Sequence, residues 1–179
     1  SMFLMIFLVT VLSIPMLYIK NEYAHLKSYF YMMSFFVISS VIFFICYWYM
    51  FKKSYGGGLK SFFKYTGTFF TFFSIAMGFS LHNSIAVLEG HFGKKSDFIR
   101  TPKFNIKTLQ DSWRKNKYIT KKPSINILAE GVLTLYFAFG MYSAFKVGDT
   151  GGDFGLFPFH LMLFFGFGYV FYTSIFTKS

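Results

Sequence analysis

Charged residues are scarce in this sequence, and acidic residues are the scarcest of them. Only 14% of the 179 residues are charged, and seven acidic residues stand against eighteen Lys and Arg. Hydrophobic residues make up 54% of the chain, and aromatic residues make up 25%. Soluble globular domains carry more charge and less apolar surface than this. The composition excludes that class and indicates a protein whose solvent is lipid.

Cysteine is nearly absent. The one cysteine, Cys46, lies inside an apolar run, which excludes a disulfide framework within the chain. The chain begins at Ser1, with hydrophobic residues directly behind it and without the basic region or cleavage site of a signal peptide. We therefore expect a piece of a longer protein, or one half of a split one.

Motifs of enzymatic chemistry are also missing. The sequence has no paired carboxylates, no cluster of metal-ligand residues, no glycine-rich phosphate loop and no nucleophile elbow. A lone histidine in an apolar helix, such as His82 or His160, is usually a packing residue whose polar atoms are satisfied. We expect no catalytic residue, no metal site and no cofactor in this chain. Nucleic acid is not an expected partner either, because no recognition module is present.

Long apolar runs are what the sequence does contain. A helix that spans a bilayer needs about 20 apolar residues. Four runs have about this length: Met2–Ile19, Tyr29–Phe51, Ile125–Phe145 and Phe154–Phe176. The sequence thus predicts an all-α membrane protein with four transmembrane helices, two within residues 1–51 and an antiparallel hairpin within 125–179.

Basic residues gather in two connections between the runs. Residues 94–122 hold ten Lys and Arg against two Asp, and four lysines (Lys52, Lys53, Lys60 and Lys64) follow the second run. Lys and Arg near the ends of spans stay in the cytoplasm and attract anionic lipid. The connections 20–27 and 148–155 are nearly neutral or acidic. We expect both chain ends in the cytoplasm and the protein in a bacterial inner (plasma) membrane.

The run Leu59–Leu88 differs from the others, because small and polar residues recur along one side of it. These residues are Gly67, Thr71, Ser74, Gly78, His82 and Glu89, whereas Phe62, Phe69, Phe73 and Met77 lie toward the other side, which we expect to face lipid. A full crossing would place the two basic connections on opposite faces of the membrane. We therefore predict an interfacial or re-entrant amphipathic helix over residues 59–93. The alternative is a fifth span that packs through its small residues.

Residues 98–103, inside the basic connection 94–124, read FIRTPK. This segment resembles the FxVTxK gating loop of processive family 2 glycosyltransferases, the membrane enzymes that make cellulose, related mannans and similar polysaccharides. Residues 80–90, SLHNSIAVLEG, are similar to the histidine-bearing helix that precedes the loop in cellulose synthase-like enzymes. The order of two spans, helix, loop and two spans also resembles the region behind the family's catalytic domain. Arg100 departs from the pattern, since the family most often has valine there.

The resemblance implies a cytoplasmic gating loop that closes over a nucleotide-sugar, with Phe98, Thr101, Pro102 and Lys103 as its substrate-binding residues. An aromatic ring can pack at the active-site mouth, a hydroxyl can hydrogen-bond phosphate, and a lysine can neutralise the diphosphate. The alternative for this segment is a plain proline turn in a basic loop.

The resemblance also sets limits on the chain. The family's aspartate motifs and QxxRW sequence are absent. The chain would then be the C-terminal membrane region of such an enzyme, inactive alone and partnered by a cytoplasmic glycosyltransferase domain in the same or a separate chain. The full enzyme would use Mg²⁺ or Mn²⁺ with a nucleotide-sugar donor, and its product would be a glycan polymer or a glycolipid.

Glu130 lies five residues into an apolar run, where an acidic residue is costly and usually faces protein or a water-filled path. Two interpretations stay open: a position that lines a polymer channel, together with His82, or a salt bridge to Lys121 or Lys122. For the whole chain, the alternative to a glycosyltransferase module is a non-enzymatic small multi-span membrane protein, such as a transporter subunit or an assembly factor.

Overall fold

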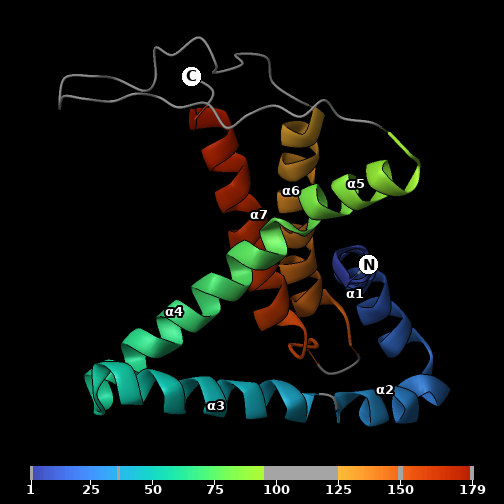
Figure 1. Cartoon of the computed structure of the whole chain (residues 1–179). Helices are drawn as coiled ribbons and strands as arrows, with labels where there is room; N and C mark the ends of the chain where they lie inside the picture. The colour runs from blue at the N-terminus through green and yellow to red at the C-terminus, as the bar shows by residue number, and fades with distance from the viewer. Residues whose placement is uncertain (1, 36, 95–124, 149–150, 178–179) are drawn as a thin grey trace, which may run out of the picture.

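The computed structural model describes residues 2–35, 37–94, 125–148 and 151–177, and every regular element within these ranges is helical (Figure 1). The elements are α1 (Met2–Glu22), the 3-10 turn η1 (Ala24–Leu26), α2 (Lys27–Ser34), α3 (Val37–Tyr55), α4 (Leu59–Gly78), α5 (Ser80–His91), α6 (Ile125–Lys146) and α7 (Phe157–Thr177). The predicted all-α class is confirmed.

Five helical stretches are long and apolar enough to cross a membrane, as an integral membrane protein requires. They are Met2–Glu22, Ala24–Tyr55, Leu59–His91, Ile125–Lys146 and Phe157–Phe176. Length and composition do not show which of these stretches cross the membrane, so the division into four spans and one interfacial helix stays a prediction. The same holds for the cytoplasmic side of the two chain ends.

Helices α6 and α7 pack antiparallel and supply most of the core. Phe137 of α6 and Phe167 of α7 have no exposed surface, and their ring centroids are 5.3 Å apart. Gly131 near the start of α6 lies against the ring of Phe171 near the end of α7, where an added Cβ would come within 2.9 Å of a ring carbon. Small residues allow this close approach of membrane helices.

Helices α4 and α5 run obliquely across this hairpin (Figure 1). The crossing is a backbone contact, because a Cβ at Gly166 of α7 would overlap the carbonyl oxygen of Ser74, and one at Gly78 would overlap the carbonyl oxygen of Gly166. Beyond the crossing, α5 packs on α1, where Ser84 Oγ donates to the Phe3 carbonyl oxygen over 3.1 Å. The middle of the small and polar stripe expected from the sequence therefore faces protein.

The opposite side of α4 carries aromatic residues that pack against α3. The centroid of the Phe44 ring of α3 lies 5.0 Å from the ring centroids of both Tyr65 and Phe69. The ring centroids of Trp48 and Phe62 are 5.1 Å apart. Tyr65 Oη also donates to the Phe44 carbonyl oxygen over 2.6 Å. The expectation that Phe62 and Phe69 face lipid is wrong, because ring-to-ring packing with α3 covers them in part.

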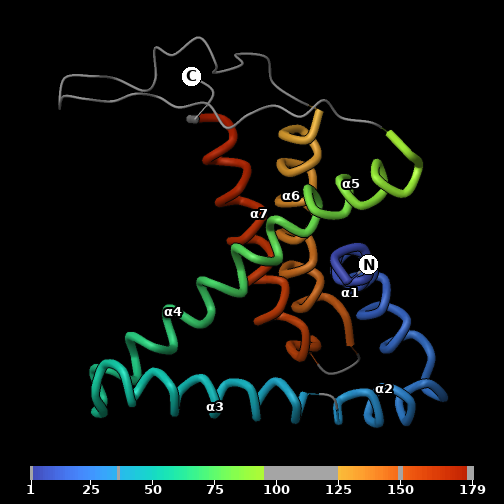
Figure 2. The backbone as a smooth tube through the Cα atoms, in the orientation of Figure 1, coloured from blue at the N-terminus to red at the C-terminus, as the bar shows by residue number. Residues whose placement is uncertain are grey.

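None of the residues of α3 is buried among the described residues. The turn from α3 into α4 contains Gly56 and Gly58, whose φ angles are 83° and 131°. Glycine adopts such positive φ angles without the steric strain that a Cβ would cause. In the view of Figure 2, α2 and α3 run across the end of the bundle at which α6 and α7 are joined. Their apolar outer surface is left for lipid.

Candidate functional site

The structure brings together the two membrane residues that the sequence singled out, His82 and Glu130. His82 is in the first turn of α5, and Glu130 is in the second turn of α6. His82 Nε2 lies 3.1 Å from Glu130 Oε1. The Glu130 side chain has no exposed surface, while the His82 side chain is 37% exposed.

Several polar atoms in this region have no hydrogen-bond partner among the described residues. They are both carboxylate oxygens of Glu130, Nδ1 of His82 and Oγ of the fully buried Ser80. The 3.1 Å separation is therefore an ion-pair distance without the alignment of a hydrogen bond. Burying such groups without partners is costly. An acidic residue kept in this position in a membrane helix points to a ligand, an ion or a proton.

Both interpretations of Glu130, a position that lines a channel and a salt bridge to Lys121 or Lys122, stay predictions. Lys121 and Lys122 lie outside the described residues, so their part is not tested. Within the described residues the partner of Glu130 is His82, on a helix that is distant in sequence. The pair joins α5 to α6 close to the start of α6.

Another histidine, His160, is fully buried and lies about 15 Å farther along the hairpin, because it contacts Gly140, which follows Glu130 by ten residues in α6. His160 of α7 has no exposed surface, and its Nε2 lies 3.0 Å from Ser13 Oγ of α1. Ser13 Oγ already donates to the Thr10 carbonyl oxygen over 2.6 Å, so it accepts from an N–H at His160 Nε2. Gly140 makes room for the imidazole, since a Cβ there would lie 3.0 Å from His160 Nδ1. The imidazole is satisfied only at Nε2, because the buried His160 Nδ1 has no hydrogen-bond partner among the described residues.

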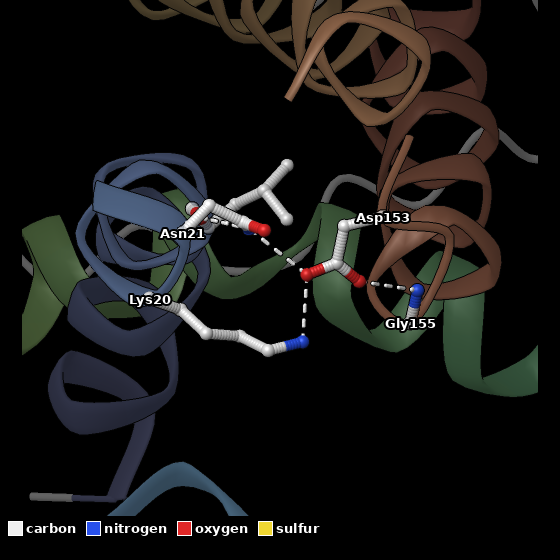
Figure 3. Close-up of polar contacts among 5 residues, drawn as sticks. Lys20, Asn21, Asp153 and Gly155 are labelled. Atoms are coloured by element: carbon white, nitrogen blue, oxygen red, sulfur yellow. Dashed lines mark hydrogen bonds and ion pairs between the residues drawn. The ribbon is translucent and has the colours of Figure 1, made fainter. Parts of the chain in front are cut away.

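A third polar cluster joins α1 to the connection between α6 and α7 (Figure 3). Lys20 Nζ lies 2.6 Å from Asp153 Oδ2, and Asn21 Nδ2 donates to the same oxygen over 2.9 Å. The Gly155 N–H donates to Asp153 Oδ1 over 3.1 Å. Burial alone would raise the pKa of the Asp153 carboxyl, but hydrogen bonds from Lys20, Asn21 and Gly155, together with the Lys20 charge, hold this pKa below its usual value.

The sequence reasoning did not single out this cluster. The two residues that meet here come from connections with few charges. Lys20 belongs to residues 20–27 and Asp153 belongs to residues 148–155. Their opposite charges were the feature of the sequence that could have predicted the pair. Gly152 is needed beside it, because its φ is 118° and a Cβ would come within 2.6 Å of the Ala144 carbonyl oxygen. The cluster holds the end of α1 against the hairpin.

The predicted gating-loop residues Phe98, Thr101, Pro102 and Lys103 lie within residues 95–124, outside the described residues. Lys94 is the last described residue before this segment, and its Nζ forms an ion pair with the Glu89 carboxylate of α5. Within the described ranges, no group of three or more His, Cys, Asp or Glu side chains is placed to hold a metal ion.

Comparisons of this chain with protein-family models, with curated proteins and with solved structures gave no match.

Proposed function

We propose that this chain is the membrane module of a glycosyltransferase that uses a nucleotide-sugar donor to build a polysaccharide or a glycolipid. One observation carries the proposal. Helix α5, which holds the SLHNSIAVLEG sequence, packs against α1 and α6, and its last residue, His91, precedes the first residue of the segment FIRTPK by seven positions. The helix that would precede a gating loop is therefore anchored through its first turns.

Three contacts support this anchoring role. The Ser80 and Leu81 side chains are buried at the start of α5, the His82 imidazole lies against Glu130 of α6, and Ser84 Oγ bonds to the backbone of α1. A loop that closes over a substrate needs hinges on a rigid support. The end of α5 and the start of α6 lie at the same end of the bundle (Figure 1).

In this proposal the donor binds in the cytoplasm, between the segment 94–124 and a catalytic domain in the same or a separate chain. That domain would hold Mg²⁺ or Mn²⁺, as the resemblance to family 2 glycosyltransferases implies. Phe98, Thr101, Pro102 and Lys103 would contact the nucleotide-sugar. The four spans and both chain ends would have the orientation that the basic connections favour.

The test uses the complete enzyme in membranes, with initial polymerisation rate measured against donor concentration. If Lys103 neutralises the diphosphate, Lys103→Ala removes a charge-assisted contact and lowers donor use by about 10-fold to 100-fold. Thr101→Ala lowers it as well. Lys107→Ala is the matched control, since it removes the same charge four residues farther on, and Arg100→Val should be mild because it restores the usual family residue.

Wild-type kinetics for both Lys103→Ala and Thr101→Ala at matched expression would remove the gating-loop assignment. The isolated chain gives a second check. Purified without a catalytic domain, it should release no nucleotide from any nucleotide-sugar, and turnover by the chain alone would contradict the proposal.

A transporter subunit is the second candidate, and the buried Glu130 carboxylate favours it. A carboxylate without full hydrogen bonding in a membrane helix is what a proton or cation path requires. Reconstituted vesicles loaded with a pH-sensitive dye distinguish the two candidates. A proton leak that Glu130→Gln abolishes would support transport, whereas tight vesicles would leave the glycosyltransferase module as the better proposal.

A further inference from the structure

A groove of about 700 Å³ lies between α4 and α7. Its walls are Phe70, Thr71 and Ile75 from α4 and Pro158, Leu161 and Phe165 from α7. These six residues precede the backbone contact between Gly78 and Gly166, and Tyr169, which follows that contact in α7, also lines the groove. The two helices touch at that contact and diverge toward their starts, which opens the groove.

Two lysines lie on α4 between the groove and the start of the helix, outside the groove lining. Lys60, Lys64, Thr71 and Ser74 follow one another at spacings of four, seven and three residues, so they share one stripe of the helix. Lys64 precedes Thr71 by about 10 Å along the helix axis, at 1.5 Å per residue. Both lysines are exposed, and among the described residues neither has an acidic partner within ion-pair distance. Two exposed lysines therefore follow the groove on the same stripe of α4, and the Lys64 ammonium lies 5.7 Å from the centroid of the Tyr55 ring.

We propose that this groove binds one acyl chain of an anionic phospholipid, whose phosphate is bound by Lys60 and Lys64. The inference is independent of the proposed glycosyltransferase function, because it uses only the contact between α4 and α7.

The chemistry of the groove selects this occupant. An empty apolar groove loses van der Waals contacts along its walls, so an apolar group that fills it is favoured. The helices that form this groove are long and apolar enough to cross a membrane, where lipid acyl chains are the surrounding apolar groups. The lysine ammonium is a compact point charge that suits a phosphate oxygen. A free phosphate would leave the apolar walls uncovered, so the combination of groove and charge indicates a lipid.

The experiment uses the whole chain in phosphatidylcholine bilayers that contain a trace of lipid with a photoactivatable acyl chain. The headgroup of the trace lipid is either phosphatidylglycerol or phosphatidylcholine, and crosslinked peptides are identified by mass spectrometry. We expect crosslinks on residues 70–75 and 158–169. The phosphatidylglycerol probe should label them about 30-fold more strongly, which is the effect of two surface lysines.

Lys60→Gln with Lys64→Gln should abolish this preference. Lys27→Gln with Lys146→Gln is the matched control, because it removes two exposed lysines away from the groove and should keep the preference. Thr71→Trp should reduce labelling by both probes, since it fills the groove, whereas Val132→Trp on the exposed side of α6 should not. Leu161→Trp fills the groove from its other wall and serves if Thr71→Trp does not fold.

Equal labelling by the two probes in the wild-type chain would overturn the anionic specificity. Unchanged labelling in a folded groove-filling variant would show that the acyl chain lies elsewhere. A stable dimer whose crosslinks join this groove to a second copy of the chain would show that protein, and not lipid, covers it. The lysine variants are at exposed positions, so their folding does not limit the test.

Discussion

Replacing His82 by Ala would leave the buried Glu130 carboxylate without the imidazole that lies 3.1 Å from it. Because His82 is partly exposed, water can fill part of the space, and we expect a loss of about 1 to 3 kcal/mol in the free energy of unfolding. The measurement is thermal unfolding in detergent. His91→Ala is the control, since His91 is an exposed histidine at the end of the same helix.

The combined variant His82→Leu and Glu130→Leu replaces both members of the pair by apolar side chains. An apolar pair avoids the cost of a buried charge, so its stability should recover at least part of the single-variant loss. If His82→Ala were as stable as the wild type, the pair would contribute nothing and its role as an anchor of α5 would be lost.

Asp153 gives a prediction about pH. Its pKa is lowered in the folded protein, so the stabilisation from its ion pair is present above the unfolded-state pKa and is lost as the pH falls through the folded value. Asp153→Asn should cost about 1 kcal/mol, because Lys20 is 36% exposed and solvent screens the pair.

This cost should be constant between pH 5 and 7 and should shrink below about pH 4, where the wild-type carboxyl also becomes neutral. Melting temperatures of the two proteins across this range give the comparison. Lys20→Gln should reproduce the effect of Asp153→Asn, and a cost that persists unchanged at strongly acidic pH would show that the ion pair is not its source.

At the scale of the helices, the contact between α4 and α7 depends on the absence of a side chain at Gly166. Gly166→Ala would push a methyl group into the Ser74 carbonyl, and forced overpacking costs about 1 to 3 kcal/mol. Gly168→Ala is the matched control two residues away, because its new Cβ would meet only Thr134 Cγ2 at 3.5 Å, an ordinary contact. Thermal stability in detergent distinguishes them. Equal stability of the two variants would contradict the backbone contact.

At the scale of the whole molecule, the orientation of α4 and α5 determines the topology. The stretch Leu59–His91 has 33 residues and is about 50 Å long, which exceeds the about 30 Å hydrocarbon core of a bilayer. This length fits either a position near the surface or a steeply tilted crossing. The basic connections on both sides of it favour the first, whereas the structure places the start of α4 and the end of α5 at opposite ends of the hairpin of α6 and α7 (Figure 1), which favours the second.

Cysteine labelling tests this topology. With Cys46 replaced by Ser, Ser54→Cys and Ser96→Cys should both react with a membrane-impermeant reagent from the cytoplasmic face only. The reason is that Lys and Arg flank both positions and stay in the cytoplasm. Labelling from opposite faces would establish a fifth span through α4 and α5 and would overturn the interfacial helix.

The sequence by itself determined that this protein is helical and apolar enough for a membrane. In lipid every backbone N–H and C=O has to be satisfied within its own segment, so long apolar runs become helices whatever their neighbours are. It also drew attention to Glu130, because an acidic residue in such a run is costly wherever the helix packs.

Only the tertiary structure decided which side chains meet. Glu130 lies against His82 and Lys20 lies against Asp153, and each pair is distant in sequence. Phe62 and Phe69 pack on α3, although the helical pattern alone placed them toward lipid. The physical reason is that the helices are placed by close contacts such as Gly78 on Gly166, and an apolar pattern is the same whether its surface meets lipid or another helix.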